Sequence, residues 1–501
     1  MTPPAERFDL AVVGGGINGA GIARDAAGRG LKVLLCEQGD LAAATSSWSS
    51  KLIHGGLRYL EHYEFRLVGE SLAEREILLR IAPHLVWAVP FVMPHTAGLR
   101  PAWMIRVGLF LYDRLGGRGT LPRSRAIRLG ATGLGSGLAP QYTRGYAYAD
   151  ARVDDARLVV LTARSAADLG ATVLTRTALV GGQRADEGWV LSLRDVTRGT
   201  ERTVTASAVV NAAGPWVQNV LERVLHEQPR GKVRLVKGSH IVVPRLYEGD
   251  HAFILQNDDG RVVFLIPYED AFTLVGTTDV PHDDPDSPPR ASNEEIEYLC
   301  RAANRYAARA IAPADVVWSY SGVRPLYDDG TAAASEVTRD YHLVVTDAGG
   351  RAPVLSVYGG KLTTYRRLAE HALEKLAPWF PALGRPWTAT APLPGGDLGG
   401  ASFAELVQAY RARYPKLDPA WLERLLRRHG TRSADILGDA ATEADLGKSF
   451  GGGLYARELT YLMEHEWARD AEDLLWRRTK CGLHMTEGQR RRVGDFLKVV
   501  A

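Results

Sequence analysis

The chain has 501 residues, of which 46% are hydrophobic and 24% charged, a composition typical of a globular protein rather than a disordered or fibrous one. Its formal net charge of +3 gives no support to nucleic-acid binding, and its length allows several domains of roughly 100 to 200 residues each. Three widely separated cysteines, Cys36, Cys300 and Cys481, indicate neither a disulfide framework nor a zinc site, so we expect a reducing compartment.

The first fifty residues have the pattern of a strand, a tight turn, a helix and a second strand. An apolar run at 8–13 ends in three glycines, residues 17–27 are small and compatible with a helix, and 31–36 is again apolar. This pattern predicts a βαβ unit at the N-terminus.

The turn of this unit carries a phosphate-binding motif. Gly14, Gly16 and Gly19 have G-x-G-x-x-G spacing, which allows a tight turn, a close approach of backbone to a pyrophosphate, and packing of helix on strand. Glu37 closes the second strand, where it can accept hydrogen bonds from an adenosine ribose. The motif predicts a dinucleotide cofactor.

Three further segments favour FAD over NAD. Residues 45–51 (TSSWSSK) form a hydroxyl-rich loop that precedes HGGLRY at 54–59, and glycine turns follow apolar strands at 211–216 and 358–365. Several turns of this type suit a long cofactor that is held at several places.

The rest of the chain divides into a β-rich part and a helical part. Residues 232–243 and 261–277 predict strands of an antiparallel sheet. Amphipathic helices are predicted at 421–428, 458–478 and 487–499, so that a helical domain begins near residue 390.

Six segments together resemble the FAD-dependent glycerol-3-phosphate dehydrogenases, the aerobic respiratory enzymes of the D-amino-acid-oxidase-like flavoproteins. They are GGGING (14–19), TSSWSSKLIHGGLRYLEHY (45–63), KGSH (237–240), GTTD (276–279), SGVRPL (321–326) and GGKLTTYR (359–366). The resemblance implies oxidation of sn-glycerol 3-phosphate to dihydroxyacetone phosphate by hydride transfer to noncovalent FAD, with electrons passed to ubiquinone or menaquinone. It implies no metal.

The resemblance also implies an α/β fold with a discontinuous FAD-binding domain of Rossmann type. We expect this domain from about 1–95, 145–225 and 320–385, a β-rich substrate domain from 226–320, and a C-terminal helical domain at 391–501. The FAD-dependent region as a whole would cover 1–390, with 96–144 as a membrane-facing candidate.

The reaction needs a phosphate clamp, a proton acceptor and a rigidly held flavin. By resemblance Arg58, Arg324 and Arg339 contact the substrate phosphate, since a guanidinium offers a planar fork to a phosphate. Lys361 would orient the substrate or stabilise negative charge at the flavin, and Tyr59 closes the pocket or simply packs.

His240 is the first candidate for the general base, because its usual pKa lies near neutrality, and His54 and Lys361 remain alternatives. The catalytic set is therefore His240, Lys361 and Arg324. The predicted cofactor contacts are Gly14, Gly16, Asn18, Gly19, Glu37, Thr45, Ser46, Ser47, Ser50, Lys51, His54, Gly55, Gly56, Ala213, Gly214, Gly359, Gly360, Lys361, Leu362 and Thr363.

Residues 100–128 hold seven arginines among aromatic and aliphatic residues, a pattern that fits either a membrane-surface segment or an ordinary amphipathic helix. No run reaches the roughly 18 apolar residues of a spanning helix, and the first residues lack a signal-peptide pattern. Since quinones lie in the bilayer, we expect a cytoplasmic enzyme in peripheral contact with the inner face of the cytoplasmic membrane. A homodimer is left open.

Three alternatives compete with this interpretation. A glycerol-3-phosphate oxidase would share the substrate but reduce dioxygen, and such oxidases usually carry an insertion that is absent from a chain of this length. A non-catalytic flavoprotein would use the fold only as a scaffold. An FAD protein that modifies nucleic acid is disfavoured, because the basic residues are not organised with base-stacking aromatic residues.

Overall fold

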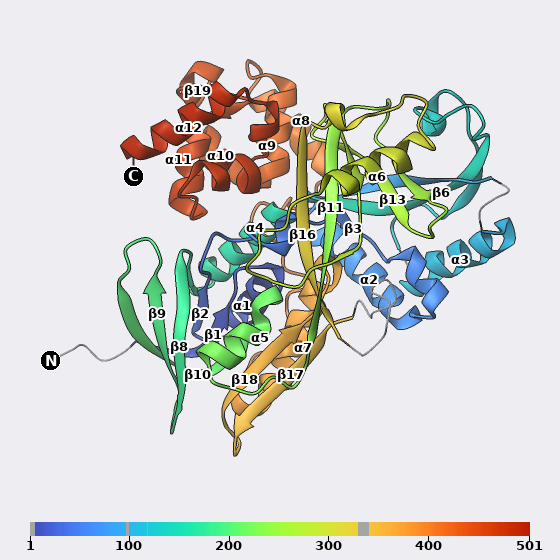
Figure 1. The fold of residues 1–501 in the computed structure, drawn as a ribbon. Helices are drawn as coiled ribbons and strands as arrows, with labels where there is room; N and C mark the ends of the chain where they lie inside the picture. Colours follow the sequence, from blue (N-terminus) through green and yellow to red (C-terminus); the bar gives the residue numbers. More distant parts are fainter. Residues whose placement is uncertain (1–5, 97–99, 118, 329–339, 501) are drawn as a thin grey trace.

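The computed structural model describes residues 6–96, 100–117, 119–328 and 340–500, together with their side chains up to residue 498. Two large β-sheets and a separate group of helices make up the molecule (Figure 1). The C-terminal helices gather at one side, and helix α3 (Ala102–Leu115) lies at the opposite side in this view. The predicted α/β architecture is confirmed.

The first sheet has eight strands and contains the N-terminal βαβ unit. Strands β7, β2, β1, β10 and β18 run parallel in this order, β17 pairs antiparallel with β18, and the β8–β9 hairpin extends from β10. The strand bounds are β1 (Glu6–Val13), β2 (Val33–Cys36), β7 (Thr172–Leu174), β8 (Thr177–Ala185), β9 (Gly188–Asp195), β10 (Glu201–Asn211), β17 (His342–Ala348) and β18 (Arg351–Tyr358). The three predicted glycine turns follow β1, β10 and β18, which are adjacent, so all three meet at one edge of the sheet.

Helices α1 (Ile17–Gly28), α4 (Asp155–Asp168) and α7 (Tyr365–Leu376) cover one face of this sheet and form the largest apolar core with it. The other face packs against the β8–β9 hairpin and the short helix α5 (Val217–Asn219). Because both faces are covered, the second half of the central strand β1, residues 10–13, is wholly apolar and buried.

The second sheet has ten strands, which are mostly antiparallel. Its order is β15-β11-β14-β13-β12-β4-β6-β3, with β16 paired to β11 and β5 paired to β6. The bounds are β3 (Leu52–Ile53), β4 (Val86–Pro94), β5 (Arg125–Arg128), β6 (Arg144–Val153), β11 (Val233–Pro244), β12 (Ala252–Gln256), β13 (Val262–Tyr268), β14 (Phe272–Gly276), β15 (Val280–Pro281) and β16 (Trp318–Tyr327). Helices α2 (Phe65–Ile81) and α3 pack on one face, and α6 (Asn293–Asn304) packs on the other.

Several strands of the second sheet come from segments that the sequence assigned to the FAD-binding domain. Strands β4, β6 and β16 lie wholly or mostly in stretches that the sequence assigned to the FAD-binding domain, yet they belong to the second sheet. Both sheets use buried apolar strands, so composition does not show which sheet a strand joins. The β-rich segment predicted at 261–277 forms an antiparallel hairpin of two strands, β13 and β14.

The C-terminal helices have an apolar core of their own. They are α8 (Phe403–Arg413), α9 (Pro419–His429), α10 (Ser433–Leu437), α11 (Ala456–His465) and α12 (Glu487–Val500), with a small hairpin of β19 (Ser449–Gly451) and β20 (Leu454–Tyr455). The prediction of one helix over 458–478 was wrong, because α11 ends at His465 and Trp467 has a left-handed backbone with φ of 57°. A separate helical turn covers Asp473–Arg478.

Candidate functional site

The turn between β1 and α1 has room only for glycine at two positions. A Cβ at Gly14, where φ is +109°, would lie 2.5 Å from the carbonyl oxygen of Ala212, and one at Gly19 would lie 1.9 Å from that of Gly14. The backbone can therefore pass close to the end of β10 while the N-terminus of α1 stays open. Such a turn, with amides and helix dipole directed at one point, is a binding site for a pyrophosphate.

Glu37 stands at the end of β2, beside this turn. Its two carboxylate oxygens accept hydrogen bonds from the amides of Gly15 (2.6 Å) and Gly39 (2.7 Å). Burial raises the pKa of Glu37, and these two amides act against that shift. The carboxylate is held in a fixed position at the wall of the cavity, where its remaining lone pairs can accept from ribose hydroxyls.

A cavity of about 760 Å³ runs from this turn to the second sheet. The three glycine turns, the hydroxyl-rich loop and residues of β11, β13 and β16 line it. Its volume falls within the range of roughly 300 to 1,000 Å³ of cofactor sites. One elongated cavity thus joins the predicted cofactor contacts to the predicted substrate contacts.

The cavity walls fit a flavin dinucleotide. Asn18 Nδ2 donates to the carbonyl oxygen of Gly359, while its Oδ1 is buried without a hydrogen-bond partner among the described residues, and Asn18 lines the cavity. Ser46 Oγ accepts a hydrogen bond from the backbone amide of Ile17, and this bond joins the hydroxyl-rich loop to the start of α1. A buried acceptor, the N-terminus of a helix and hydroxyl groups are the kind of groups that phosphates and a ribityl chain require.

Most predicted cofactor contacts line the cavity, and four do not. The four are Gly19, Ser47, Lys51 and Gly55. Lys51 Nζ is buried 2.9 Å from Asp155 Oδ1, and a Cβ at Gly55 would lie 2.7 Å from the Leu72 side chain. These residues shape the walls without reaching the space inside.

His240 lies on β11 and lines the cavity beside the hydroxyl-rich loop. Its Nε2 is 2.9 Å from Ser50 Oγ, and its ring stacks on Tyr320 of β16 with a centroid distance of 4.8 Å. Burial lowers the pKa of His240 well below its usual range, and the charges of Arg324 and Lys51 lower it further. A neutral imidazole near pH 7 is able to accept a proton.

The alternative base, His54, lines the same cavity. Burial, followed by the charges of Lys361 and Arg75, lowers its pKa to about 4. The backbone amide of His54 lies 3.4 Å from Thr363 Oγ1, so the segment at 54–59 and the glycine turn at 358–365 touch each other here. Both histidines are therefore neutral at physiological pH, and pKa alone does not separate them.

Four of the five predicted substrate contacts line the same cavity as the predicted cofactor contacts. Arg58, Tyr59, Arg324 and Lys361 all line it, and Lys361 Nζ lies 3.9 Å from the centroid of the Tyr59 ring. Arg324 forms an ion pair with Asp279, and its Nη2 donates to the carbonyl oxygen of Thr278 at 3.0 Å. Arg339 lies outside the described residues. Several positive charges in one cavity provide a site for a phosphate.

Sequence reasoning missed much of the lining. Residues of the second sheet line the cavity, and so do residues of the segments that follow β7 and α5. They include Tyr148, Ile254, Phe264, Thr177, Leu179, Val220 and Val224. No motif marks such residues, because a buried apolar side chain in a strand has the same pattern whether it faces a core or a cofactor.

Comparison with known proteins gives a consistent result. The family model described as FAD dependent oxidoreductase matches residues 9–366, and the model for the C-terminal domain of alpha-glycerophosphate oxidase matches 386–500. The chain is similar to a glycerol-3-phosphate dehydrogenase of Pseudomonas aeruginosa, with 54% identity over 99% of this chain and 96% of the relative.

Two further relatives are both 49% identical. One is the aerobic glycerol-3-phosphate dehydrogenase of Escherichia coli, aligned over 98% of this chain and 97% of the relative. The other is a D-erythritol 1-phosphate dehydrogenase of Brucella abortus, aligned over 97% and 96%. The solved FAD complex of a Bacillus halodurans glycerol-3-phosphate dehydrogenase matches with a TM-score of 0.72 and 26% identity, covering 98% of this chain and 94% of that chain.

Proposed function

Because the chain belongs to the family of FAD-dependent glycerol-3-phosphate dehydrogenases, we propose that it oxidises sn-glycerol 3-phosphate to dihydroxyacetone phosphate and passes the electrons to a membrane quinone. The chain is an FAD-dependent oxidoreductase. The observation that carries the choice of substrate is the cavity itself, which is lined by Arg58, Arg324 and Lys361 and by two neutral histidines as well as by the cofactor contacts.

Cationic side chains and one histidine of the cavity have separate roles in the proposed reaction. Arg58 and Arg324 bind the substrate phosphate, and Lys361 on the third glycine turn orients the substrate. His240 takes the hydroxyl proton on an imidazole nitrogen while the substrate carbon is oxidised. Bound FAD supplies the acceptor for the hydride from that carbon.

The apolar part of the cavity wall supports the same reaction. Ile254, Phe264 and Tyr148 belong to the second sheet and line the cavity beside His54 and His240. Their side chains exclude water, which strengthens the electrostatic interactions of the nearby charged groups.

A second substrate is favoured by one specific observation. The relative named D-erythritol 1-phosphate dehydrogenase is as similar to this chain as the aerobic glycerol-3-phosphate dehydrogenase of Escherichia coli. Both names describe a polyol with a terminal phosphate. We therefore rank the erythritol ester as the second candidate, and dioxygen as the alternative acceptor because the C-terminal domain matches a model named for an oxidase.

Surface chemistry supports peripheral contact with a membrane. On α3, Ile105, Leu109 and Tyr112 are buried, while Trp103 and Phe110 are 66% and 53% exposed. The helix is thus apolar on its outer face as well as its inner face, with exposed arginines nearby. Within the described ranges, none of the helices has both the length and the apolar character needed to cross a bilayer.

The purified holoenzyme tests the proposal under anaerobic conditions. Addition of sn-glycerol 3-phosphate should bleach the oxidised flavin spectrum within seconds, and a parallel sample with D-erythritol 1-phosphate measures the rival substrate. Reoxidation by a short-chain quinone should be much faster than by dioxygen. A spectrum that stays oxidised with glycerol 3-phosphate would remove the substrate assignment, and fast reoxidation by dioxygen would favour the oxidase.

A further inference from the structure

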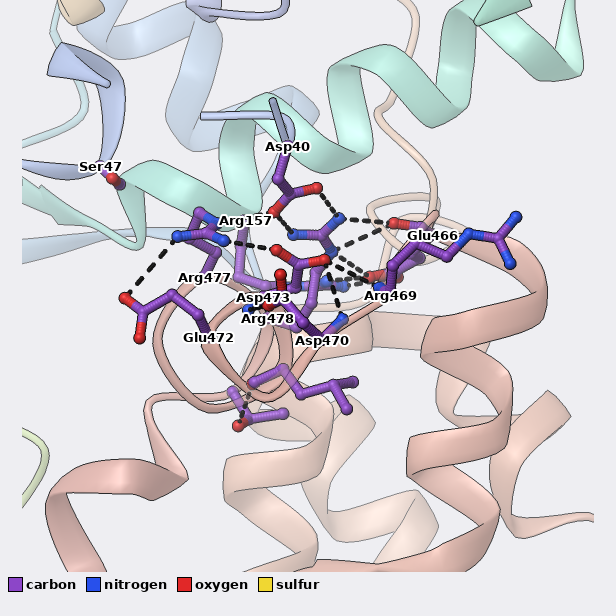
Figure 2. Close-up of polar contacts among 12 residues, drawn as sticks. Asp40, Ser47, Arg157, Glu466, Arg469, Asp470, Glu472, Asp473, Arg477 and Arg478 are labelled. Carbon is purple, nitrogen blue, oxygen red and sulfur yellow. Dashed lines mark hydrogen bonds and ion pairs between the residues drawn. The ribbon is translucent and has the colours of Figure 1, made fainter. Parts of the chain in front are cut away.

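The loop after β2 has two sides with different surroundings. Glu37, Gln38 and Gly39 line the cofactor cavity, and so do residues 42–46. Asp40 lies between these two stretches but does not line the cavity, and its side chain is only 1% exposed. The side chain of Asp40 points toward arginines of the C-terminal domain (Figure 2).

Two consecutive arginines of the C-terminal domain hold this carboxylate. Arg478 binds it in a bidentate manner, with Nη1 to Oδ2 at 2.7 Å and Nη2 to Oδ1 at 2.8 Å. Arg477 donates from Nε to Oδ2 at 2.6 Å. The side chain of Arg478 is fully buried, and its Nη2 also donates to the backbone carbonyl of Glu466 at 2.6 Å. A bidentate pair of this kind fixes both position and orientation.

A third arginine joins the same loop to the same part of the C-terminal domain. The backbone amide of Arg176 donates to the carbonyl oxygen of Gly39 at 2.9 Å. Its guanidinium donates to both carboxylate oxygens of Asp473, at 2.8 and 2.7 Å, and Asp473 also pairs with Arg477. Arg477 thus pairs with both Asp40 and Asp473 within this network (Figure 2).

The same stretch of the C-terminal domain also reaches the far end of the cavity-lining loop. Lys480 Nζ lies 3.2 Å from Asp154 Oδ1, and the next residue, Asp155, accepts from Ser49 Oγ at 2.7 Å. The ring of Trp476 stacks on Trp318 of β16 at 4.7 Å. The loop between β2 and β3, residues 37–51, is called the cofactor loop below. Residues 473–480 therefore support both ends of this loop through groups that do not line the cavity.

We propose that residues 473–480 of the C-terminal domain are a positioning element of the FAD site, with Arg477 and Arg478 acting through Asp40. The loop that lines the cavity is ordered by these ion pairs before the cofactor arrives. FAD then binds without first having to order the loop, and the holoprotein retains it more tightly. Without the guanidinium groups, the buried Asp40 carboxylate would move toward water and take the loop with it.

The dissociation constant of FAD tests this proposal in the full-length chain. Apoprotein is titrated with FAD, and the bound fraction is followed by flavin fluorescence. Arg478→Gln should raise the dissociation constant of FAD roughly tenfold or more. Asp40→Asn should raise it similarly, because this change removes the negative charge of the Asp40–Arg478 pair while the side chain keeps its size. Arg478→Lys should rescue binding only in part, since an ammonium cannot form the bidentate fork.

A control separates positioning from general stability. Arg432→Gln removes a contact that also joins the C-terminal domain to α4, at Asp168, but is remote from the cofactor loop. The melting temperature is measured with and without FAD for every variant. A positioning role decreases the stabilisation that FAD adds, whereas a merely structural role lowers both temperatures equally.

Wild-type affinity for FAD in Asp40→Asn would overturn the proposal, even if Arg478→Gln failed to fold. An equal loss of affinity in Arg432→Gln would also overturn it, because the effect would then belong to any contact between the two domains.

Discussion

Nε2 of His240 lies 2.9 Å from Oγ of Ser50, so the candidate base on the second sheet is tied to the loop that lines the cofactor cavity. The adjacent Ser49 donates a hydrogen bond to Asp155. The carbonyl oxygen of Ser49 accepts a hydrogen bond from the hydroxyl of Tyr320, and the His240 ring stacks on the ring of Tyr320. The ring orientation therefore depends on Tyr320 of the second sheet and on the loop between β2 and β3. A base held in this way can be aligned with a substrate before the reaction begins.

The first prediction concerns the base. His240→Gln should keep its FAD and bind substrate nearly as the wild type does, because glutamine can still bond to Ser50. Flavin reduction should slow by about 10²- to 10⁴-fold, the usual contribution of a general base. Stopped-flow bleaching at saturating substrate measures this rate. His54→Gln is the matched comparison, and a slow His54 variant beside a fast His240 variant would assign the role to His54.

The second prediction concerns the phosphate clamp. Arg324→Ala should raise KM by roughly tenfold or more, because a charge-assisted contact to the phosphate is lost, while the flavin spectrum stays unchanged. Steady-state kinetics over a wide range of substrate concentration measure this. Arg261→Ala is the control, since Arg261 pairs with Asp259 next to β13 and does not line the cavity. An unchanged KM in Arg324→Ala would contradict the clamp.

The third prediction concerns the outer face of α3. Replacing both Trp103 and Phe110 by Glu should abolish flotation with anionic vesicles, because two exposed apolar anchors are lost and negative charge is added. Activity with a soluble dye acceptor should be retained. Leu169→Glu, at an exposed apolar position that ends α4, is the control. A double variant that floats as well as the wild type at low salt would exclude docking through this face.

The fourth prediction concerns pH. Burial, followed by the charges of Arg157, His429 and Arg427, lowers the pKa of His84 to about 3. The unfolded chain, with a His pKa near 6.5, therefore binds one proton more than the folded chain between these values. The contribution of the neutral, buried His84 to the free energy of unfolding is therefore complete above about pH 6.5, and it is lost progressively as the pH falls toward the folded pKa.

Urea denaturation between pH 7 and pH 4 measures this dependence. His84→Gln should reduce the slope of the unfolding free energy by up to about 1.4 kcal/mol per pH unit, the value for one proton. An equal slope in wild type and variant would show that other groups are responsible for acid sensitivity.

The sequence predicted local structure best where one residue type is sterically required. Gly14 and Gly19 could be assigned because the turn has no room for a Cβ, and Glu37 because it follows the second strand of the same unit. In the second sheet, the segments of β11, β13 and β14 were predicted as antiparallel strands, but the membership of β4, β6 and β16 could not be assigned in this way. Their pairing depends on tertiary packing between distant segments, such as β4 with β6 and β11 with β16.

The contacts behind the cofactor loop were also beyond sequence reasoning. An arginine pair such as Arg477 and Arg478 looks like part of an exposed helical face, and Asp40 looks like an ordinary turn residue. Only the packing of the C-terminal domain on the loop buries all three. Helix α11 ends at His465, and the next residue, Glu466, is buried next to Arg157 of α4.

The bond between Asp40 and Arg478 joins residues that are 438 positions apart, so it also sets an order of events during protein synthesis. The N-terminal βαβ unit leaves the ribosome early, but the groups that hold its cofactor loop emerge only when the chain is nearly complete. We therefore expect nascent or C-terminally truncated chains to capture FAD poorly, and cofactor loading to be one of the last steps in making this enzyme.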